Sequence, residues 1–400
     1  MRHKFNSPLA IFENQKDHFS DEKVNNFFSK FSKFGKTMGN SVVIPSYGNW
    51  YIDPLKKMKI KFNSTIESST FFLTLDCLDE NNHPVIVKAY QYTELISPLP
   101  VVQYSWDYFH ELSKSEDKSI CGFKPIKIVD KCVFMVRPKF EYTLSQRLSD
   151  YPLPVDIEKW WISYQFLTAV KTFHDLNLVH GNLHPENVFI SWDLRLTIGD
   201  PAPYKPPQIR YNQPQIFIHF FGSSNTHCYL SPRRLILNEQ DIIHEFKDLD
   251  KSDDIFAVGC ILYFIFTQKH LFSLTTMGLY KEGKYNDEIE HSLEELPIDI
   301  RPFVKHCISL DTIQRTETFN NYKAFFPAYF SQFYDQIEVF FNSQVSLQNF
   351  VYMIPAFEAY ATIGGNDVRI ILTNILAQFL LKSDDLMSKV KFSYFFVDFF

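Results

Sequence analysis

The residues whose types could do chemistry are gathered in three short runs. The longest, Leu178–Val188, reads Leu-Val-His-Gly-Asn-Leu-His-Pro-Glu-Asn-Val. A second run, Ile198–Ala202, carries Asp200, and a third, Val85–Lys88, ends in a lysine. Such side chains can bind anions and exchange protons. Taken singly, each also has an ordinary reading, such as a surface lysine or a histidine satisfied in the core. Their order and the elements around them therefore decide what they indicate.

The elements that must position these runs change character near residue 140. Short strands are predicted at Ile66–Leu75, Val85–Tyr90 and Lys131–Val136. A polar turn at 79–82 joins the first two, and a helix is expected around Val102–Ser113. The first part of the chain is thus rich in strands.

The second part is mainly helical. From Ile157 to Lys171 the apolar residues follow a period of 3.6, and Asp156 is a natural N-cap. A short strand at 194–198, a long irregular segment at 201–250 and a buried helix at 254–267 follow. A small strand-rich part before a larger helical part indicates an α+β fold with two lobes.

Five motifs in this order resemble those of protein kinases. The run 178–188 resembles the catalytic loop, and Ile198–Ala202 stands where a kinase has Asp-Phe-Gly. Ser231–Arg233 replaces Ala-Pro-Glu, Asp253–Cys260 resembles the central C-lobe helix, and Val85–Lys88 resembles the strand with the phosphate-pairing lysine. Each motif is weak alone, but their shared order is specific.

The resemblance narrows to one family, the kinase-like regulatory subunits of the class III phosphatidylinositol 3-kinase complex. It is carried by the segments at 157–170, 180–188, 220–232, 254–260 and 271–274, and it covers roughly residues 38–400. The family implies a bilobal kinase-like domain followed by HEAT-like helical repeats. It also implies partnership with the lipid-kinase catalytic subunit and associated subunits, on endosomal or autophagic membranes.

The resemblance assigns roles to individual residues. Lys88 and Asp200 would bind the phosphates and Mg²⁺ of ATP, and Asn187 would be a second metal ligand. Asp254 would hold the backbone of the catalytic loop by hydrogen bonds. Glu111 is the choice for the helix glutamate that pairs with Lys88.

Other positions depart from the kinase pattern. Asn182 stands at the base position, and an amide cannot accept a proton as a carboxylate does. His184 replaces the catalytic-loop lysine and is mostly neutral at pH 7. No glycine lies between positions 48 and 122, so the loop over the phosphates, 64–72, lacks the usual close-approaching backbone. Pro201 and Ala202 replace the flexible end of Asp-Phe-Gly.

Arg233 stands where the Ala-Pro-Glu glutamate is expected, and Arg315 is its expected partner. A salt bridge would thus have become two like charges.

Three functions follow from these departures. The favoured one is a pseudokinase scaffold that regulates a lipid kinase and binds ATP and Mg²⁺ weakly. The alternative is a slow but active Ser/Thr protein kinase. A third reading, a helical adaptor with a kinase relic, predicts no response to nucleotide at all.

The expected domains are a tail at 1–37, the kinase-like domain at 38–328 and helical repeats from 329 to 400. The kinase-like domain divides into lobes of about 50–136 and 140–328. An apolar stripe at 368–380 predicts one repeat helix, against which a last helix from about 385 would pack. If translation starts at Met38, Gly39 is the expected myristoylation site; a start at Met1 would leave the phenylalanine-rich 23–36 segment as a membrane contact or a plain tail.

Composition excludes several classes. The net charge of −6 gives no sign of a nucleic-acid binder. The six cysteines form no Cys-x-x-Cys pair, so zinc and redox motifs lack support, and a reducing, cytosolic compartment is expected. The longest apolar run, 255–266, is shorter than the roughly 20 residues that span a bilayer.

Overall fold

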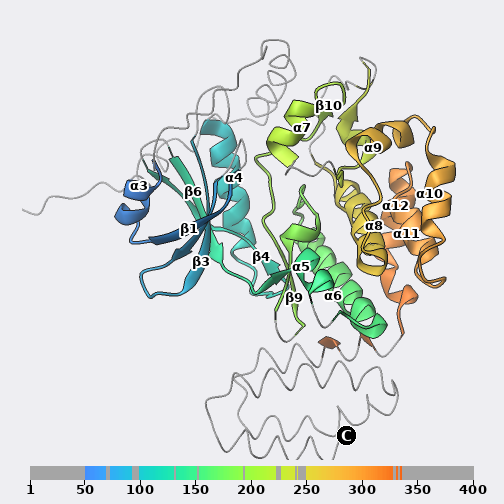
Figure 1. Ribbon diagram of the computed structural model, residues 1–400, viewed down its shortest axis with the longest axis horizontal. Coiled ribbons are helices and arrows are strands. Elements are labelled where there is room, and N and C mark those ends of the chain that lie inside the picture. Colours follow the sequence, from blue (N-terminus) through green and yellow to red (C-terminus); the bar gives the residue numbers. More distant parts are fainter. Residues whose placement is uncertain are drawn as a thin grey trace, which may run out of the picture.

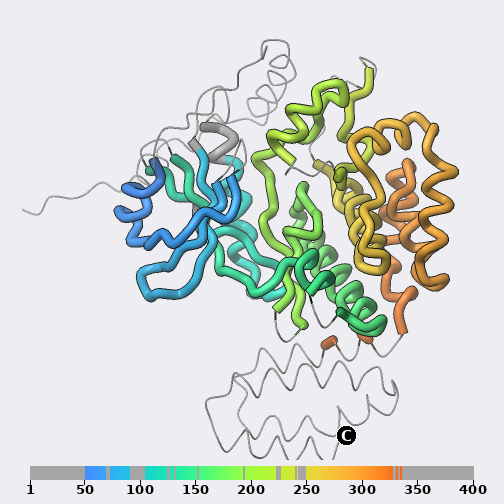
Figure 2. Tube along the Cα trace, viewed as in Figure 1, coloured from blue at the N-terminus to red at the C-terminus, as the bar shows by residue number. Residues whose placement is uncertain are grey.

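The computed structural model describes residues 50–335, apart from short gaps at 69–72, 92–98, 130–131, 151–152, 192–193, 222–226, 239–240, 242–248, 328–329 and 332–333. These residues form two lobes that lie side by side (Figures 1 and 2). The smaller lobe is built mainly on strands and the larger one mainly on helices, as the sequence pattern indicates.

The small lobe is a five-stranded antiparallel sheet in the order β1-β2-β3-β6-β5. Its strands are β1 (Lys61–Ser68), β2 (Leu73–Leu78), β3 (Pro84–Gln91), β5 (Lys124–Val129) and β6 (Cys132–Pro138). The helix α3 (Ile52–Lys57) precedes it, and α4 (Leu99–Leu112) lies against the sheet beside β5.

The alternation of side chains along β3 separates the core from the cleft. Val85, Val87 and Ala89 are buried in one apolar cluster with residues of β2 and β6. The residues between them, Ile86 and Lys88, line the cavity on the other face. This period of two is what places Lys88 at the cleft.

One predicted strand has the wrong bounds. The expected strand Ile66–Leu75 combines the end of β1 with the start of β2, because both have strand-like residues. The predicted turn at 79–82 is present. There the Asp79 carboxylate accepts hydrogen bonds from the backbone N–H groups of Asn81 and His83, and Asn82 has a φ of 62°.

The large lobe is organised around two long helices that pack together, α6 (Asp156–Asp175) and α8 (Lys251–Thr267). Every residue of α8 from Ser252 to Ile265 is buried. Asp250 caps this helix by accepting a hydrogen bond from the Ser252 N–H. In α6 the Glu158 carboxylate reaches back to the Val155 N–H, so Val155 rather than Asp156 is the cap.

Further helices complete this lobe: α5 (Leu144–Ser149), α7 (Pro214–Phe221), α9 (Leu274–Lys281), α10 (Asn286–Leu293), α11 (Arg301–Cys307) and α12 (Thr312–Asn320). Short 3-10 turns lie at η1 (Pro185–Asn187), η2 (Pro232–Arg234) and η4 (Tyr322–Phe325).

Two small sheets complete the framework of the cleft. One has the order β4-β9-β8-β7, with β4 (Ile120–Cys121), β7 (Tyr142–Thr143), β8 (Val188–Ile190) and β9 (Leu196–Gly199). The other pairs β10 (Ile209–Arg210) with β11 (Leu235–Ile236). The run 178–188 ends at β8 and Asp200 follows β9, so this sheet brings the two runs together.

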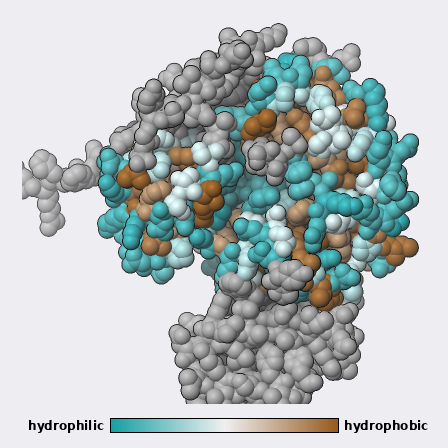
Figure 3. Space-filling model, viewed as in Figure 1, coloured by the Kyte–Doolittle hydropathy of each residue, from teal (hydrophilic) through white to brown (hydrophobic). Residues whose placement is uncertain are grey.

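Several expectations lie outside the described residues. They concern the 23–36 segment, Gly39, and the repeat helices at 368–380 and beyond. In the described part, no helix is long and apolar enough to cross a membrane. Apolar residues on the face shown in Figure 3 occur singly or in small groups among polar ones.

Candidate functional site

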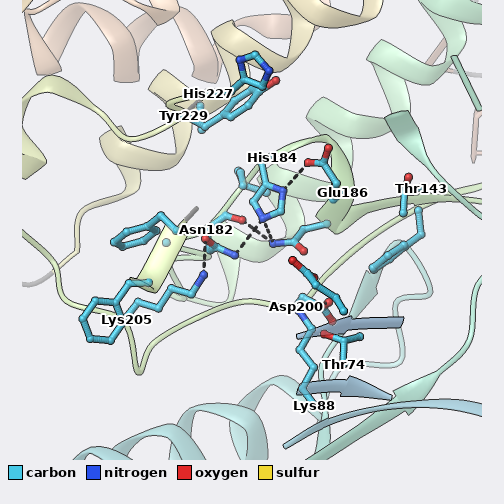
Figure 4. A pocket seen from close by; sticks show the side chains of 18 of the residues that line it. Thr74, Lys88, Thr143, Asn182, His184, Glu186, Asp200, Lys205, His227 and Tyr229 are labelled. Atoms are coloured by element: carbon cyan, nitrogen blue, oxygen red, sulfur yellow. Dashed lines mark hydrogen bonds and ion pairs between the residues drawn. The ribbon is translucent and has the colours of Figure 1, made fainter. Parts of the chain in front are cut away.

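A cavity of about 430 Å³ lies where the two lobes meet. The small lobe contributes residues such as Thr74, Lys88 and Arg137, and the large lobe contributes Asn182 and Asp200. The volume falls in the usual range for small-ligand pockets, roughly 300–1,000 Å³. The cavity therefore brings together residues that the sequence singled out: Lys88, Asn182, His184 and Asp200, which Figure 4 labels, and Asn187.

Asp200 lies at the centre of a buried ionic group. Its Oδ2 is 2.7 Å from the Lys88 Nζ, and its Oδ1 is 2.5 Å from the Arg137 Nε. A second guanidinium nitrogen of Arg137 lies 3.2 Å from Oδ2. Burial alone would raise the pKa of Asp200, but the cations of Arg137 and Lys88 hold it well below its usual range. The carboxylate is therefore charged, and a cation binds each of its two oxygens.

The backbone of Asp200 is unusual as well. Its φ is 57°, in the left-handed region that residues other than glycine seldom adopt. Such strain is retained where the surroundings fix it, often at a functional site. The turn after β9 aims the carboxylate into the cleft.

Arg137 is the residue of this group that the sequence reasoning missed. It lies near the end of β6, and its side chain is 8% exposed. The guanidinium lies 4.4 Å from the ring centre of Phe189 and also donates to the Pro138 carbonyl at 3.0 Å. The signal available in the sequence is a charged residue directly after the apolar run 132–136.

Asn182, at the base position, is bound to a lysine. Its Oδ1 accepts a hydrogen bond of 3.0 Å from the buried Lys205 Nζ (Figure 4). Burial, and then the nearby charges of Lys88 and Arg234, lower the pKa of Lys205 well below its usual range. Lys205 was also missed, because it sits in the irregular 201–250 segment without any periodic pattern.

His184 joins Asn187 to a carboxylate. Its Nδ1 lies 2.8 Å from the Glu186 Oε2, and its Nε2 lies 2.8 Å from the Asn187 Nδ2 (Figure 4). The same amide nitrogen donates to the Asn182 carbonyl at 2.8 Å. With Glu186 accepting from Nδ1–H, the Nε2 lone pair faces the two amides.

Asp254 fixes the backbone of the run 178–188. Its two carboxylate oxygens accept hydrogen bonds of 2.8 Å from the N–H groups of His180 and Gly181. His174 lies 3.0 Å from the same carboxylate. Gly181 has a φ of +72°, a backbone conformation that would strain any other side chain at this position.

The assignment of Glu111 as the partner of Lys88 is wrong. Glu111 is exposed at the end of α4 and pairs with Lys114 at 2.6 Å. Lys114 is three residues further along the chain, so the Glu111 side chain can reach it without leaving this end of the helix. Glu111 does not line the cleft. Lys88 instead pairs with Asp200.

The two arginines of the expected like-charge pair do act on each other: burial, and then the charge of Arg233, lower the pKa of Arg315, while Asp253 opposes this. Arg233 binds the Asp253 carboxylate through its Nε at 2.7 Å and a terminal nitrogen at 2.5 Å. Arg315 is 1% exposed, with its guanidinium 5.6 Å from the Phe256 ring centre. Arg234, also buried, donates to the carbonyls of Gly181, Pro206 and Pro207.

The burial of His180 predicts a stability that depends on pH. Its Nε2 lies 2.8 Å from the Gly199 carbonyl, and burial lowers its pKa to about 4. Unfolded histidine takes up a proton near pH 6.5, so acid stabilises the unfolded chain first. We expect the free energy of unfolding to fall by about 2 kcal/mol from pH 7 to 5 through this residue. His219 and His270, whose pKa is also lowered to about 4, act in the same direction.

Denaturant unfolding at pH 5, 6 and 7 tests this expectation. His180→Gln should have a flatter pH profile than the wild type. His83→Gln is the control, because His83 is largely exposed. Equal stability of the wild type at pH 5 and 7 would contradict the assignment of a neutral His180.

The protein kinase domain model matches residues 52–324. The chain is 31% identical over 292 residues to the Serine/threonine-protein kinase VPS15 of Saccharomyces cerevisiae, covering 71% of this chain and 20% of that relative. It is 36% identical over 213 residues to that of Arabidopsis thaliana, covering 51% and 14%. A putative VPS15 of Komagataella pastoris is 28% identical over 297 residues, covering 71% and 21%.

The chain thus matches about a fifth or less of the length of these relatives. The matched region is the one that contains the cleft, Lys88, the run 178–188 and Asp200. The chain belongs to the protein kinase domain family, and its kinase region is VPS15-like.

Proposed function

We propose that this chain is a kinase-like regulatory module that supports a class III phosphatidylinositol 3-kinase by binding to it, not by phosphorylating proteins. The observation that carries the proposal is the state of Asn182. Its amide takes the base position, and its oxygen is held by Lys205. A group in that state cannot accept the proton of an attacking hydroxyl.

The surroundings of Asp200 support the same reading. In a phosphotransferase this carboxylate would hold Mg²⁺, whereas here Lys88 and Arg137 bind both of its oxygens. The similarity of the kinase region to the VPS15 relatives of yeast and Arabidopsis supports membership of the family that the sequence resembles. Helical repeats after residue 329, endosomal or autophagic membranes and lipidation at Gly39 belong to this proposal as well.

Purification of the native protein under mild conditions tests the proposed association. Recovery of a lipid kinase that forms phosphatidylinositol 3-phosphate, in stoichiometric amounts, is the expected result. Lys269→Ala, which breaks the exposed pair Lys269–Glu295, serves as a surface control. It should leave the recovery of the lipid kinase unchanged. Recovery of a monomer without lipid-kinase activity would contradict the proposal.

A second candidate function is a slow Ser/Thr protein kinase, and one observation favours it. The Glu186–His184 pair has the order of an orienting carboxylate and a histidine base, with its Nε2 toward Asn182. That Nε2 already faces the Asn187 amide at 2.8 Å, so the base is engaged. Phosphotransfer that is lost in His184→Ala would support this candidate.

A further inference from the structure

The residues of the cleft do not fit the divalent metal that the kinase family implies. Mg²⁺ needs oxygen ligands at about 2.0–2.1 Å in octahedral geometry. Both carboxylate oxygens of Asp200 are bound by cationic nitrogens within 3.2 Å. A metal at Asp200 would therefore have to displace Arg137, or share the carboxylate with it against like-charge repulsion.

Arg137 is held in this place by more than Asp200. Its guanidinium lies over Phe189, which in turn is stacked on Phe140 with ring centres 4.6 Å apart. A backbone carbonyl takes a further N–H. Moving the guanidinium would forfeit the aromatic contact and leave a buried charge to be solvated.

The buried charges around Asp200 sum to a positive value. Lys88 and Arg137 approach it from the sheet, and Lys205 approaches Asn182 from the segment after Asp200. Glu67 also acts on Lys205, but it is exposed to solvent. Lys88 and Arg137 thus face one buried carboxylate, and the Lys205 amine adds a hydrogen-bond donor on the Asn182 side of the cleft. The other buried carboxylates that line the cavity are bound elsewhere, Asp253 to Arg233 and Asp254 to the catalytic-loop backbone. Glu186 is bound to His184, and Glu141 is exposed to solvent.

We propose that Arg137 and Lys205 replace the divalent metal of this cleft, so that it binds the phosphates of a nucleoside triphosphate without Mg²⁺. The inference rests on the proposed function in one respect, namely that the cleft binds and does not transfer phosphate. Lys88 and Lys205 supply the donors, and Arg137 neutralises Asp200, whose charge would otherwise repel the phosphates.

The test is to titrate the full chain with ATP, once in the presence of EDTA and once in the presence of excess Mg²⁺, and to measure the dissociation constant in each case. The dissociation constant in EDTA is expected to lie within about threefold of that in Mg²⁺, or below it. Inorganic tripolyphosphate in EDTA should compete with ATP, and adenosine should not. Binding that is tenfold or more tighter with Mg²⁺, or no binding under either condition, overturns the inference.

Variants separate the roles of Arg137 and Lys205. Lys205→Met should weaken ATP binding about tenfold in EDTA, because it removes the N–H donors that the buried amine offers to the phosphates. Arg137→Met should free Asp200 and make ATP binding depend on Mg²⁺. Lys305→Met is the matched control and should leave ATP binding unchanged, because Lys305 is exposed, pairs with Glu290 at 2.6 Å and lies outside the cavity. An Arg137→Met variant still indifferent to Mg²⁺ would contradict the role of Arg137.

Different results would contradict the metal-independent site and the proposed function. Binding that requires Mg²⁺ but leads to no phosphotransfer would overturn only the metal-independent site. Phosphotransfer by the wild type would overturn the proposed function instead.

Discussion

Replacement of Asp200 by alanine is expected to lower the free energy of unfolding by about 3–5 kcal/mol, the cost of breaking a buried ion pair by removing one partner. The carboxylate is 2% exposed, and its loss leaves Lys88 and Arg137 facing each other without a counter-ion. Denaturant unfolding at pH 7 measures the change. Because the pKa of Asp200 is held low, its contribution is present above the unfolded pKa of about 3.9 and is lost as the pH falls further.

Two comparisons make this result specific. Asp76→Ala breaks the half-exposed pair with Lys139 and should cost about 1 kcal/mol or less. Adding Arg137→Met to Asp200→Ala should recover part of the loss, because one unpaired cation is removed with its partner. An Asp200→Ala variant as stable as the wild type would contradict the buried ionic group.

Replacement of Asp254 by alanine is the second change expected to have a large effect. It removes the acceptor of two backbone N–H groups and of His174 in a fully buried place. Each unsatisfied buried donor costs about 1–3 kcal/mol, so a loss of about 3–5 kcal/mol is expected.

Asp254→Asn should lose less, since its one oxygen still accepts a hydrogen bond from the loop. Urea unfolding measures the free energy of unfolding of the two variants and of the wild type. Equal losses in Asp254→Ala and Asp254→Asn would mean that the hydrogen bonds to His180 and Gly181 are not what Asp254 contributes.

The elements of the fold were predictable where periodicity is long. The helices α6 and α8 came from a 3.6 pattern and from a continuous apolar run, and β3 and β6 from strand-like runs with turns beside them. The boundary between β1 and β2 was not, because strand-like residues continue across it.

The candidate site was predictable only where its residues share a motif. Lys88, Asn182 and Asp200 follow the order of known motifs, and the cleft brings them together. Arg137 and Asp200 are 63 positions apart, and Lys205 and Asn182 are 23 apart. No local pattern connects such pairs, since their contact depends on how the lobes fold.

Ion pairs are also hard to predict from the sequence. Glu111 has the residue type that would pair with Lys88, but its helical neighbour Lys114 lies within reach. The predicted like charges of Arg233 and Arg315 do act on each other, but the sequence does not show that Asp253, 20 positions away, binds Arg233. Ion pairs between distant segments need the structure.

Phosphotransfer from radiolabelled ATP to a general protein substrate tests the central claim most directly. The wild type, Lys88→Ala and Asn182→Asp should all give the same background labelling. A general base contributes about 10²–10⁴ in rate. The carboxylate that Asn182→Asp restores is nevertheless not enough, because Arg137 still binds the Asp200 carboxylate. Labelling by the wild type that is lost in Lys88→Ala would contradict the account.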